Sequence, residues 1–252
     1  MKTKLLATTL AAATAAVLVK QGKLHRPNLH QIAGNAPIWH PALCQLDPHA
    51  PLYGKQVLWL GSSITEGSGA KGVAMSDYLM AQDGLIATKQ AVSGTALAGP
   101  EVNSYYVRLI EQVPPATPYD CAVVQLSTND IRMNKPLGHI TDAAKQQAFN
   151  TETTLGALEA ILAYIQNTWA CPVLIYSCIH PADHDYAALT AAMVPLQHKW
   201  QFTFLDLNHN AALNAATHAN PLAMADDIHP TQLGYRNLWT PLFRQALEQM
   251  LI

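Results

Sequence analysis

Two short segments far apart in the chain carry the residue types that nucleophilic catalysis needs. Ser63 follows Gly61 in a segment where the glycine lets the backbone turn and leaves the serine beside free amide groups. Such a serine is suited to attack a carbonyl group. Near the C-terminus, Asp226 precedes His229 by three residues on a turn pinned by Pro230, so the carboxylate can orient the imidazole as a general base. Taken singly, helix capping by a serine and a surface loop with one histidine explain these segments at least as well.

Two further segments carry small and polar residues of the kind that form turns. Gly94 lies in the segment 91–95, and Asn129 lies within Ser127-Thr128-Asn129-Asp130. Alone, the first is an ordinary turn and the second is typical of an Asx turn. A phosphate-binding loop is excluded at 61–67, because the lysine that such a loop requires directly after its last glycine is missing.

The elements that must position these residues can be predicted from apolar runs. Short runs without alternation, each followed by a helical stretch, indicate a parallel sheet that is covered on both faces. In such a sheet the active site lies beyond the carboxyl ends of the strands, which is where Ser63, Gly94 and Asn129 fall. We expect strands at 56–60, 87–92, 121–126, 172–178 and 202–207, and helices at 74–82, 105–112, 143–169, 186–200 and 232–251.

Together, the four segments resemble the four ordered blocks of the SGNH hydrolase family, also called GDSL esterases and lipases. The resemblance runs from about residue 56 to the C-terminus. It covers the nucleophile block, the glycine block, the Gly-x-Asn-Asp block and the Asp-x-x-His-Pro block, which correspond to Gly61–Ser63, Ser93–Gly94, Ser127–Asp130 and Asp226–Pro230.

The resemblance implies a role for each matching residue. Ser63 would attack the acyl carbonyl, His229 would remove its proton, and Asp226 would hold His229. The oxyanion hole would consist of the Ser63 N–H, the Gly94 N–H and the side-chain amide of Asn129.

The resemblance also implies a fold, and the chain departs from the family pattern at two positions. The implied fold is a flavodoxin-like three-layer α/β/α sandwich around a five-stranded parallel sheet, which agrees with the elements predicted above. Ser62 stands where the name-giving pattern has Asp, and we expect it to serve the turn rather than the chemistry. Ser127 replaces the glycine of the third block, which puts the geometry near Asn129 in question.

Composition excludes several other classes of protein. A chain of 252 residues, half of them hydrophobic, can bury the core of one large domain. A net charge of −2 argues against an electrostatic nucleic-acid binder. The histidines are scattered and none forms a cluster with ligand spacing, so no metal site and no cofactor are expected. The cysteines are not a disulfide framework, although a single disulfide stays open; they are Cys44, Cys121, Cys171 and Cys178.

The N-terminus has the composition of an export signal. Lys2 and Lys4 precede an uncharged run, 5–19, that is rich in Ala, Leu and Thr. This pattern is typical of a signal peptide, and the run is short for a spanning helix, which needs about 20 residues. A mitochondrial-type presequence is the lesser alternative. We therefore expect an exported protein, extracellular or attached to a membrane through residues 5–19, with a signal peptide or anchor at 1–22, a linker at 23–54 and the catalytic domain at 55–252.

The expected function is hydrolysis of carboxylic esters. The expected substrate is a small molecule or a glycan that carries a short-chain acyl ester or a sugar O-acetyl ester. Tyr105, His180 and His184 are the expected substrate contacts, since they follow the glycine block and the fourth strand. The alternative is a non-catalytic cell-surface carbohydrate-binding protein that keeps the fold of a lost hydrolase. The intact triad positions favour the enzyme.

Overall fold

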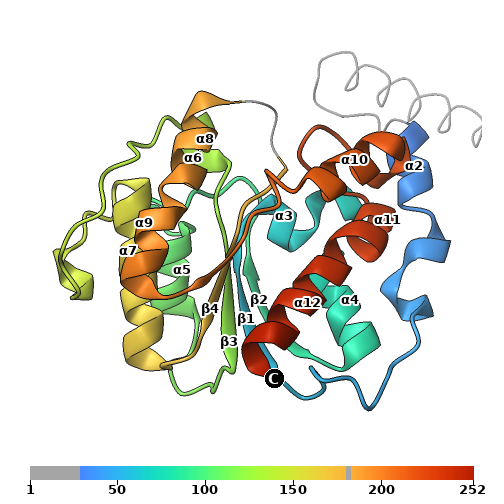
Figure 1. The fold of residues 1–252 in the computed structure, drawn as a ribbon, viewed down its shortest axis with the longest axis horizontal. Helices are drawn as coiled ribbons and strands as arrows, with labels where there is room; N and C mark the ends of the chain where they lie inside the picture. The colour runs from blue at the N-terminus through green and yellow to red at the C-terminus, as the bar shows by residue number, and fades with distance from the viewer. Residues whose placement is uncertain (1–28, 180–182) are drawn as a thin grey trace, which may run out of the picture.

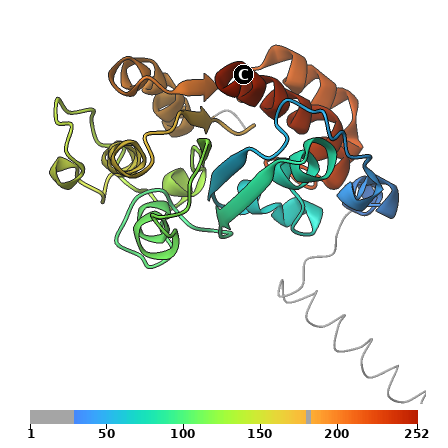
Figure 2. The ribbon, with the colours of Figure 1, turned by 90° about the horizontal axis from the view of Figure 1, so that it is seen from below.

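The structure is a computed structural model that describes residues 29–179 and 183–252. A twisted sheet of five parallel strands lies between two layers of helices (Figure 1, Figure 2). This arrangement confirms the predicted α/β fold. The strands are hydrogen-bonded in the order β2-β1-β3-β4-β5, and they are β1 (Gln56–Gly61), β2 (Ile86–Ala91), β3 (Cys121–Gln125), β4 (Val173–Tyr176) and β5 (Thr203–Leu205).

Helices cover both faces of the sheet (Figure 1). One face is covered by α4 (Met75–Asp83) and α12 (Thr240–Leu251), with α2 (Leu29–Gly34), α10 (Ala211–Ala219) and α11 (Gln232–Gly234) further out. The other face is covered by α5 (Tyr105–Gln112), α7 (Thr154–Thr168), α8 (His184–Ala191) and α9 (Met193–Trp200). Two single-turn helices, α3 (Ser63–Glu66) and α6 (Asn129–Arg132), begin directly beyond the carboxyl ends of β1 and β3.

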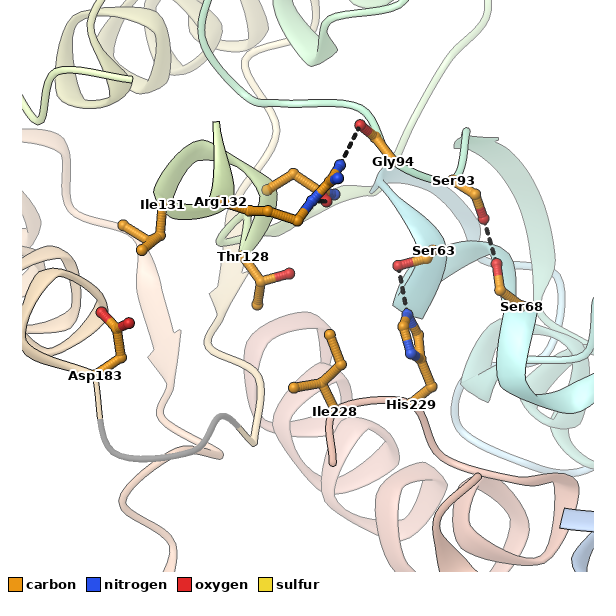
Figure 3. Close-up of a pocket in the computed structure, with 11 residues that line it drawn as sticks. Ser63, Ser68, Ser93, Gly94, Thr128, Ile131, Arg132, Asp183, Ile228 and His229 are labelled. Carbon is orange, nitrogen blue, oxygen red and sulfur yellow. Dashed lines mark hydrogen bonds between the residues drawn. The ribbon is translucent and has the colours of Figure 1, made fainter. Parts of the chain in front are cut away.

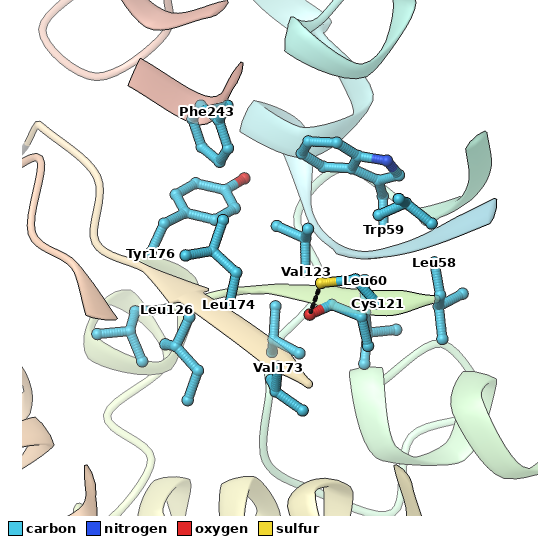
Figure 4. Packing of buried hydrophobic residues seen from close by; sticks show 14 of the residues in the cluster. Leu58, Trp59, Leu60, Cys121, Val123, Leu126, Val173, Leu174, Tyr176 and Phe243 are labelled. Carbon is cyan, nitrogen blue, oxygen red and sulfur yellow. Dashed lines mark hydrogen bonds between the residues drawn. The ribbon is translucent and has the colours of Figure 1, made fainter. Parts of the chain in front are cut away.

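The central strands are buried on both faces, which explains why their sequences do not alternate (Figure 4). On one face, the ring of Phe243 from α12 packs against Trp59 of β1 and Tyr176 of β4, with ring centroids 5.6 Å and 4.9 Å apart. On the opposite face, Leu58 and Leu60 point toward the second layer of helices. This core fixes the strand ends that carry the site.

Three predicted helices differ from those in the structure. The helix expected at 143–169 begins only at Thr154, because the preceding Thr153 accepts a hydrogen bond from the Gly156 N–H and caps the helix there. The helix expected at 186–200 is divided at Ala192, so that Pro195 lies in the first turn of α9, where its missing N–H loses no bond. The helix expected at 232–251 contains a π-helical turn, Tyr235–Trp239, between α11 and α12.

Residues 29–54, expected to form an extended linker, instead pack against the domain. Asn35 donates to the Gly69 carbonyl at 2.8 Å and accepts from the Gln232 N–H at 2.9 Å, and Leu52 is fully buried. The sequence did not predict this packing, because the segment is rich in proline and polar residues and forms only single turns of 3-10 helix, which leave no hydrophobic periodicity. The predicted signal peptide or anchor lies outside the described residues. Within the described part of the chain, no helix is long and apolar enough to cross a membrane.

All four cysteines lie within the described residues, and all are free thiols. Cys121 and Cys178 are fully buried, as their strand positions predict. Burial raises the pKa of the Cys178 thiol to about 12, so this side chain is a packing residue and not a reactive thiolate.

Candidate active site

The turn that carries Ser63 is built by a close approach of three segments. β1 ends at Gly61 and α3 begins at Ser63, so the Ser63 N–H belongs to the first turn, where amides have no acceptor within the helix. A Cβ atom on Gly61 would lie 1.8 Å from the Thr65 hydroxyl oxygen, which leaves glycine as the residue that fits. The sharp turn from strand to helix therefore presents the Ser63 side chain at the carboxyl edge of the sheet.

A buried glutamine from the neighbouring strand holds this turn. The Gln125 Oε1 atom accepts hydrogen bonds from the Ser62 N–H at 3.0 Å, the Thr65 N–H at 3.2 Å and the Thr65 hydroxyl at 2.7 Å. Its Nε2 donates to the Ser62 hydroxyl at 3.2 Å. Ser62, which departs from the family pattern, thus serves the turn. Gln125 was missed in the sequence, although a single polar residue in the run 121–126 was a signal.

The structure brings Ser63, His229 and Asp226 together. The His229 Nε2 atom lies 2.8 Å from the Ser63 hydroxyl oxygen (Figure 3). The His229 Nδ1 atom lies 2.8 Å and 2.9 Å from the two carboxylate oxygens of Asp226. The turn that carries His229 is closed by a hydrogen bond from the Ala225 N–H to the His229 carbonyl at 2.8 Å. Gly69 packs closely against His229: a Cβ atom added at Gly69 would lie 2.7 Å from the His229 Cβ atom.

Asp226 is held as a carboxylate. Partial burial opposes its ionisation, but hydrogen bonds from the His229 ring and from the backbone N–H groups of Ile228 and His229 outweigh burial and lower the pKa of Asp226 to about 2. An ionised carboxylate on Nδ1 selects the tautomer in which Nε2 can accept the Ser63 proton. The adjacent Asp227 has no such hydrogen bond to the ring among the contacts of the described residues.

Gly94 and Asn129 line the same cavity as Ser63 and His229. Gly94 has a φ of +77°, a left-handed conformation that favours glycine, while nothing nearby would obstruct a side chain. The Asn129 Nδ2 atom donates to the Thr95 carbonyl at 3.0 Å, and its Oδ1 atom accepts from the Arg132 Nε–H at 3.2 Å. The second N–H of the Asn129 amide is thereby left for another acceptor.

The turn below Asn129 is anchored by its two neighbours. The Ser127 hydroxyl accepts from the N–H groups of Asn129 at 3.1 Å and Asp130 at 3.3 Å, so this serine caps α6 in place of the glycine of the family pattern. Asp130 accepts from the N–H groups of Leu97 at 2.7 Å and Ala98 at 3.0 Å. Burial nevertheless raises the pKa of Asp130 above its usual value. Asp130 thus ties α6 to the segment after Gly94.

A buried arginine, which was not predicted from the sequence, holds the backbone at the end of β1. Arg108 is fully buried, and its Nη2 atom donates to the Gly61 carbonyl at 2.7 Å and to the Thr95 hydroxyl at 3.3 Å, while Nε donates to the Asn103 carbonyl at 2.9 Å. It lies on the apolar face of α5, three residues after Tyr105. A cation on the buried face of an amphipathic helix was the available signal.

The cavity above Ser63 has a volume of about 550 Å³. One wall is apolar, with Ile131 and Ile228. Another is polar, because the hydroxyls of Ser68 and Ser93 hydrogen-bond to each other (Figure 3). Both hydroxyls also contact the Glu66 carboxylate. The remaining lining residues are Ser63, Gly94, Thr128, Asn129, Arg132, Asp183 and His229.

Two of the three predicted substrate contacts do not line this cavity. Tyr105 is fully buried, because α5 packs its Tyr105, Arg108 and Leu109 face against the sheet, and this corrects the prediction. The His184 side chain is 97% exposed at the start of α8 and is not among the lining residues, so that prediction is also wrong. Its neighbour Asp183 faces the cavity instead and caps α8. His180 lies outside the described residues. Among the described residues, no cluster of His, Cys, Asp or Glu could hold a metal ion.

Comparison with known proteins agrees with this arrangement. The model of the GDSL-like lipase/acylhydrolase family matches residues 59–236, which run from within β1 to the π-helical turn before α12 and include Ser63 and His229. The chain belongs to this family. The family assignment confirms the resemblance seen in the sequence and supports an ester hydrolase. A search of curated proteins found no match.

Solved structures with the same fold are distant in sequence. A protein from Lactobacillus plantarum superposes with a TM-score of 0.64 at 23% identity, covering 79% of this chain and 99% of its own. A carbohydrate acetylesterase family member from Sinorhizobium meliloti has a TM-score of 0.54 at 16% identity, with 78% and 99% covered. A family two carbohydrate esterase from Clostridium thermocellum, in complex with cellohexaose, has a TM-score of 0.55 at 12% identity, with 78% and 64% covered. At these identities the likeness shows the fold alone.

Proposed function

We propose that this member of the GDSL-like family is a serine esterase with Ser63 as nucleophile. The observation that carries the proposal is the continuous chain of hydrogen bonds from Ser63 through His229 to Asp226, open to a cavity at the carboxyl edge of the sheet. Nucleophile, base and orienting carboxylate stand in hydrogen-bond order and at hydrogen-bond distance, which is the arrangement that acyl transfer needs.

Acylation would follow from this geometry. His229 Nε2 takes the Ser63 proton while Oγ attacks the ester carbonyl carbon. The carbonyl oxygen becomes an oxyanion that accepts hydrogen bonds from the Ser63 N–H, the Gly94 N–H and the free N–H of the Asn129 amide. The imidazolium, stabilised by the ionised Asp226, then returns its proton to the leaving alcohol as the tetrahedral intermediate collapses to the acyl-enzyme.

Deacylation reuses the same groups. His229 removes a proton from a water molecule, whose oxygen attacks the acyl carbon and forms a second oxyanion in the same hole. Collapse of this intermediate expels the Ser63 oxygen, which takes the proton from His229, and releases the carboxylic acid. The enzyme returns to its starting state with one ester bond and one water consumed.

The cavity favours a small acyl group on a polar alcohol. Its apolar wall of Ile131 and Ile228 suits a short acyl chain, while the hydroxyl oxygens of Ser68 and Ser93, which donate to Glu66, can accept hydrogen bonds from the hydroxyls of a sugar. The fold neighbours that act on or bind carbohydrate support a glycan ester among the substrates. We therefore propose short-chain acyl esters or sugar O-acetyl esters as the substrate class.

An ester panel tests this proposal. Wild-type protein is assayed against p-nitrophenyl acetate, butyrate and decanoate, and against an acetylated oligosaccharide by acetate release. We expect hydrolysis of acetate esters, a fall in kcat/KM with the longer chain, and loss of turnover in Ser63→Ala. Absence of turnover on every ester would refute the enzyme and favour a carbohydrate-binding protein, which calorimetry with the same oligosaccharide would detect.

We further propose that residues 5–19 direct export of the protein, on the basis of their composition alone. Expression of the full chain with a C-terminal tag, followed by cell fractionation and N-terminal sequencing, tests this. A mature N-terminus after residue 19 in the exported fraction supports a cleaved signal, and an intact N-terminus in the membrane fraction supports an anchor. Intact protein confined to the cytosol would contradict both.

A further inference from the structure

We propose that Arg132 is a positioning residue that sets which way the Asn129 amide faces, and so completes the oxyanion hole. The inference rests on the proposed function, because it assigns Arg132 a part in ester hydrolysis that the triad does not supply. Arg132 is exposed at the C-terminal end of α6, three residues after Asn129, and its guanidinium lines the cavity above Ser63 (Figure 3).

The orientation of the amide follows from what its two partners can do. A guanidinium can only donate hydrogen bonds, so the Arg132 Nε–H, 3.2 Å from Asn129, must face the amide oxygen. A carbonyl can only accept, so the Thr95 carbonyl, 3.0 Å away, must face the amide nitrogen. Both contacts require the same orientation, and a flipped amide would break both. In the orientation that both contacts require, the second N–H of the Asn129 amide remains free to donate to an oxyanion.

Without the arginine only one of these two restraints remains. The Thr95 carbonyl still attracts the amide nitrogen, but nothing else among the described contacts holds the Asn129 Oδ1 atom. The amide can then rotate about its side-chain bonds and turn oxygen lone pairs toward the place where negative charge develops. An acceptor at that place repels the oxyanion, so a partly disordered amide lowers kcat more than it changes substrate binding.

The other contacts of Arg132 lead to the same place. Its Nη2 atom lies 3.5 Å from the Gly94 carbonyl, at the outer limit of a hydrogen bond, and Gly94 is the second proposed oxyanion donor. Within the described residues Arg132 makes no salt bridge, so surface ion pairing does not account for its placement. The shorter of its two bonds, at 3.2 Å, goes to Asn129, so the positioning effect is assigned to the amide and not to Gly94.

The test is a double-mutant cycle on p-nitrophenyl acetate, with Arg132→Ala, Arg132→Lys, Asn129→Ala and the double variant Arg132→Ala/Asn129→Ala. Arg132→Ala should lower kcat about tenfold, the effect of losing one charge-assisted hydrogen bond, with little change in KM. Arg132→Lys keeps the charge but not the planar Nε–H, so it should lose most of the same activity. Met133→Ala, the exposed neighbour in the same turn, is the matched control and should keep wild-type kcat.

The double variant separates positioning from a direct effect. If Arg132 acts through the amide, Arg132→Ala lowers kcat about tenfold in the wild type and has almost no effect in the Asn129→Ala background. An equal loss in both backgrounds, full activity of Arg132→Lys, or unchanged kcat in Arg132→Ala would overturn the inference. Urea unfolding and the pH profile of kcat should stay as in the wild type. An inactive wild type without fluorophosphonate labelling would instead remove the proposed function, and the inference with it.

Discussion

Replacing Gln125 by leucine should destabilise the protein by loosening the turn that carries Ser63. Gln125 is fully buried, and its oxygen is the acceptor for two backbone N–H groups, those of Ser62 and Thr65. Leucine of similar volume supplies no acceptor. A buried donor left unpaired costs about 1–3 kcal/mol, so the two amides together cost about 2–6 kcal/mol of the free energy of unfolding, and the more apolar side chain offsets part of this. The Thr65 hydroxyl adds little, since Tyr176 lies within 2.7 Å as another partner.

Urea unfolding followed by circular dichroism measures this loss, with Gln112→Leu at the exposed end of α5 as the matched control. The control should stay within about 0.5 kcal/mol of the wild type, as surface substitutions usually do. Turnover of p-nitrophenyl acetate, measured where the variant is still folded, should also fall, because Ser63 is no longer fixed against His229. A Gln125→Leu protein as stable as the control would refute the argument that Gln125 holds the turn.

Three further outcomes are expected. Arg108→Leu removes a buried donor from the carbonyls of Gly61, Gln90 and Asn103 and should cost about 3 kcal/mol or more in urea unfolding; a loss below about 1 kcal/mol would contradict its supporting role. Gly69→Ala should displace His229 and lower kcat, since its Cβ atom would lie 2.7 Å from that of His229, and unchanged turnover would count against the tight wall. The folded-state pKa of Asp226 lies below its usual value, so its stabilising effect is present above about pH 4 and is lost as the pH falls toward 2. The Asp226 carboxylate is half exposed, so its contribution is small. In acid unfolding curves over that range, the free energy of unfolding should fall further in the wild type than in Asp226→Asn, by less than about 1 kcal/mol. Equal falls in the two proteins would be evidence against the hydrogen bond between Asp226 and His229.

The sheet could be predicted from the sequence because its central strands, β1, β3 and β4, are buried on both faces. A run such as Cys121–Gln125 has no polar alternation, and burial on both faces is the physical reason for that pattern. Helix ends were harder to predict. Alanine-rich sequence favours a helix from residue 143, yet the helix begins only at Thr154, where the Thr153 side chain caps it. Local hydrogen bonds of single side chains decide such boundaries, and periodicity does not report them.

The residues of the candidate triad could be predicted because each follows a strand or lies on a short turn, where the chemistry of one side chain stands out. Gln125 and Arg108 could not be predicted in the same way, because their function is to hold backbone groups of other segments. Their partners, the Ser62 amide and the Gly61 carbonyl, become neighbours only after the sheet has formed. Tyr105 was wrongly predicted to contact the substrate, because its place after the glycine block indicated the cavity. In the structure Tyr105 lies on the apolar face of α5 and is buried in the core.

The central claim, that Ser63 is a nucleophile activated by His229, is tested most directly by covalent labelling. Folded wild-type protein is treated with a fluorophosphonate, digested, and the adduct located by mass spectrometry. The structure predicts one adduct on Ser63, no adduct in Ser63→Ala, and only slow labelling in His229→Ala. Folded protein that is not labelled, or that is labelled on another serine, would contradict the account.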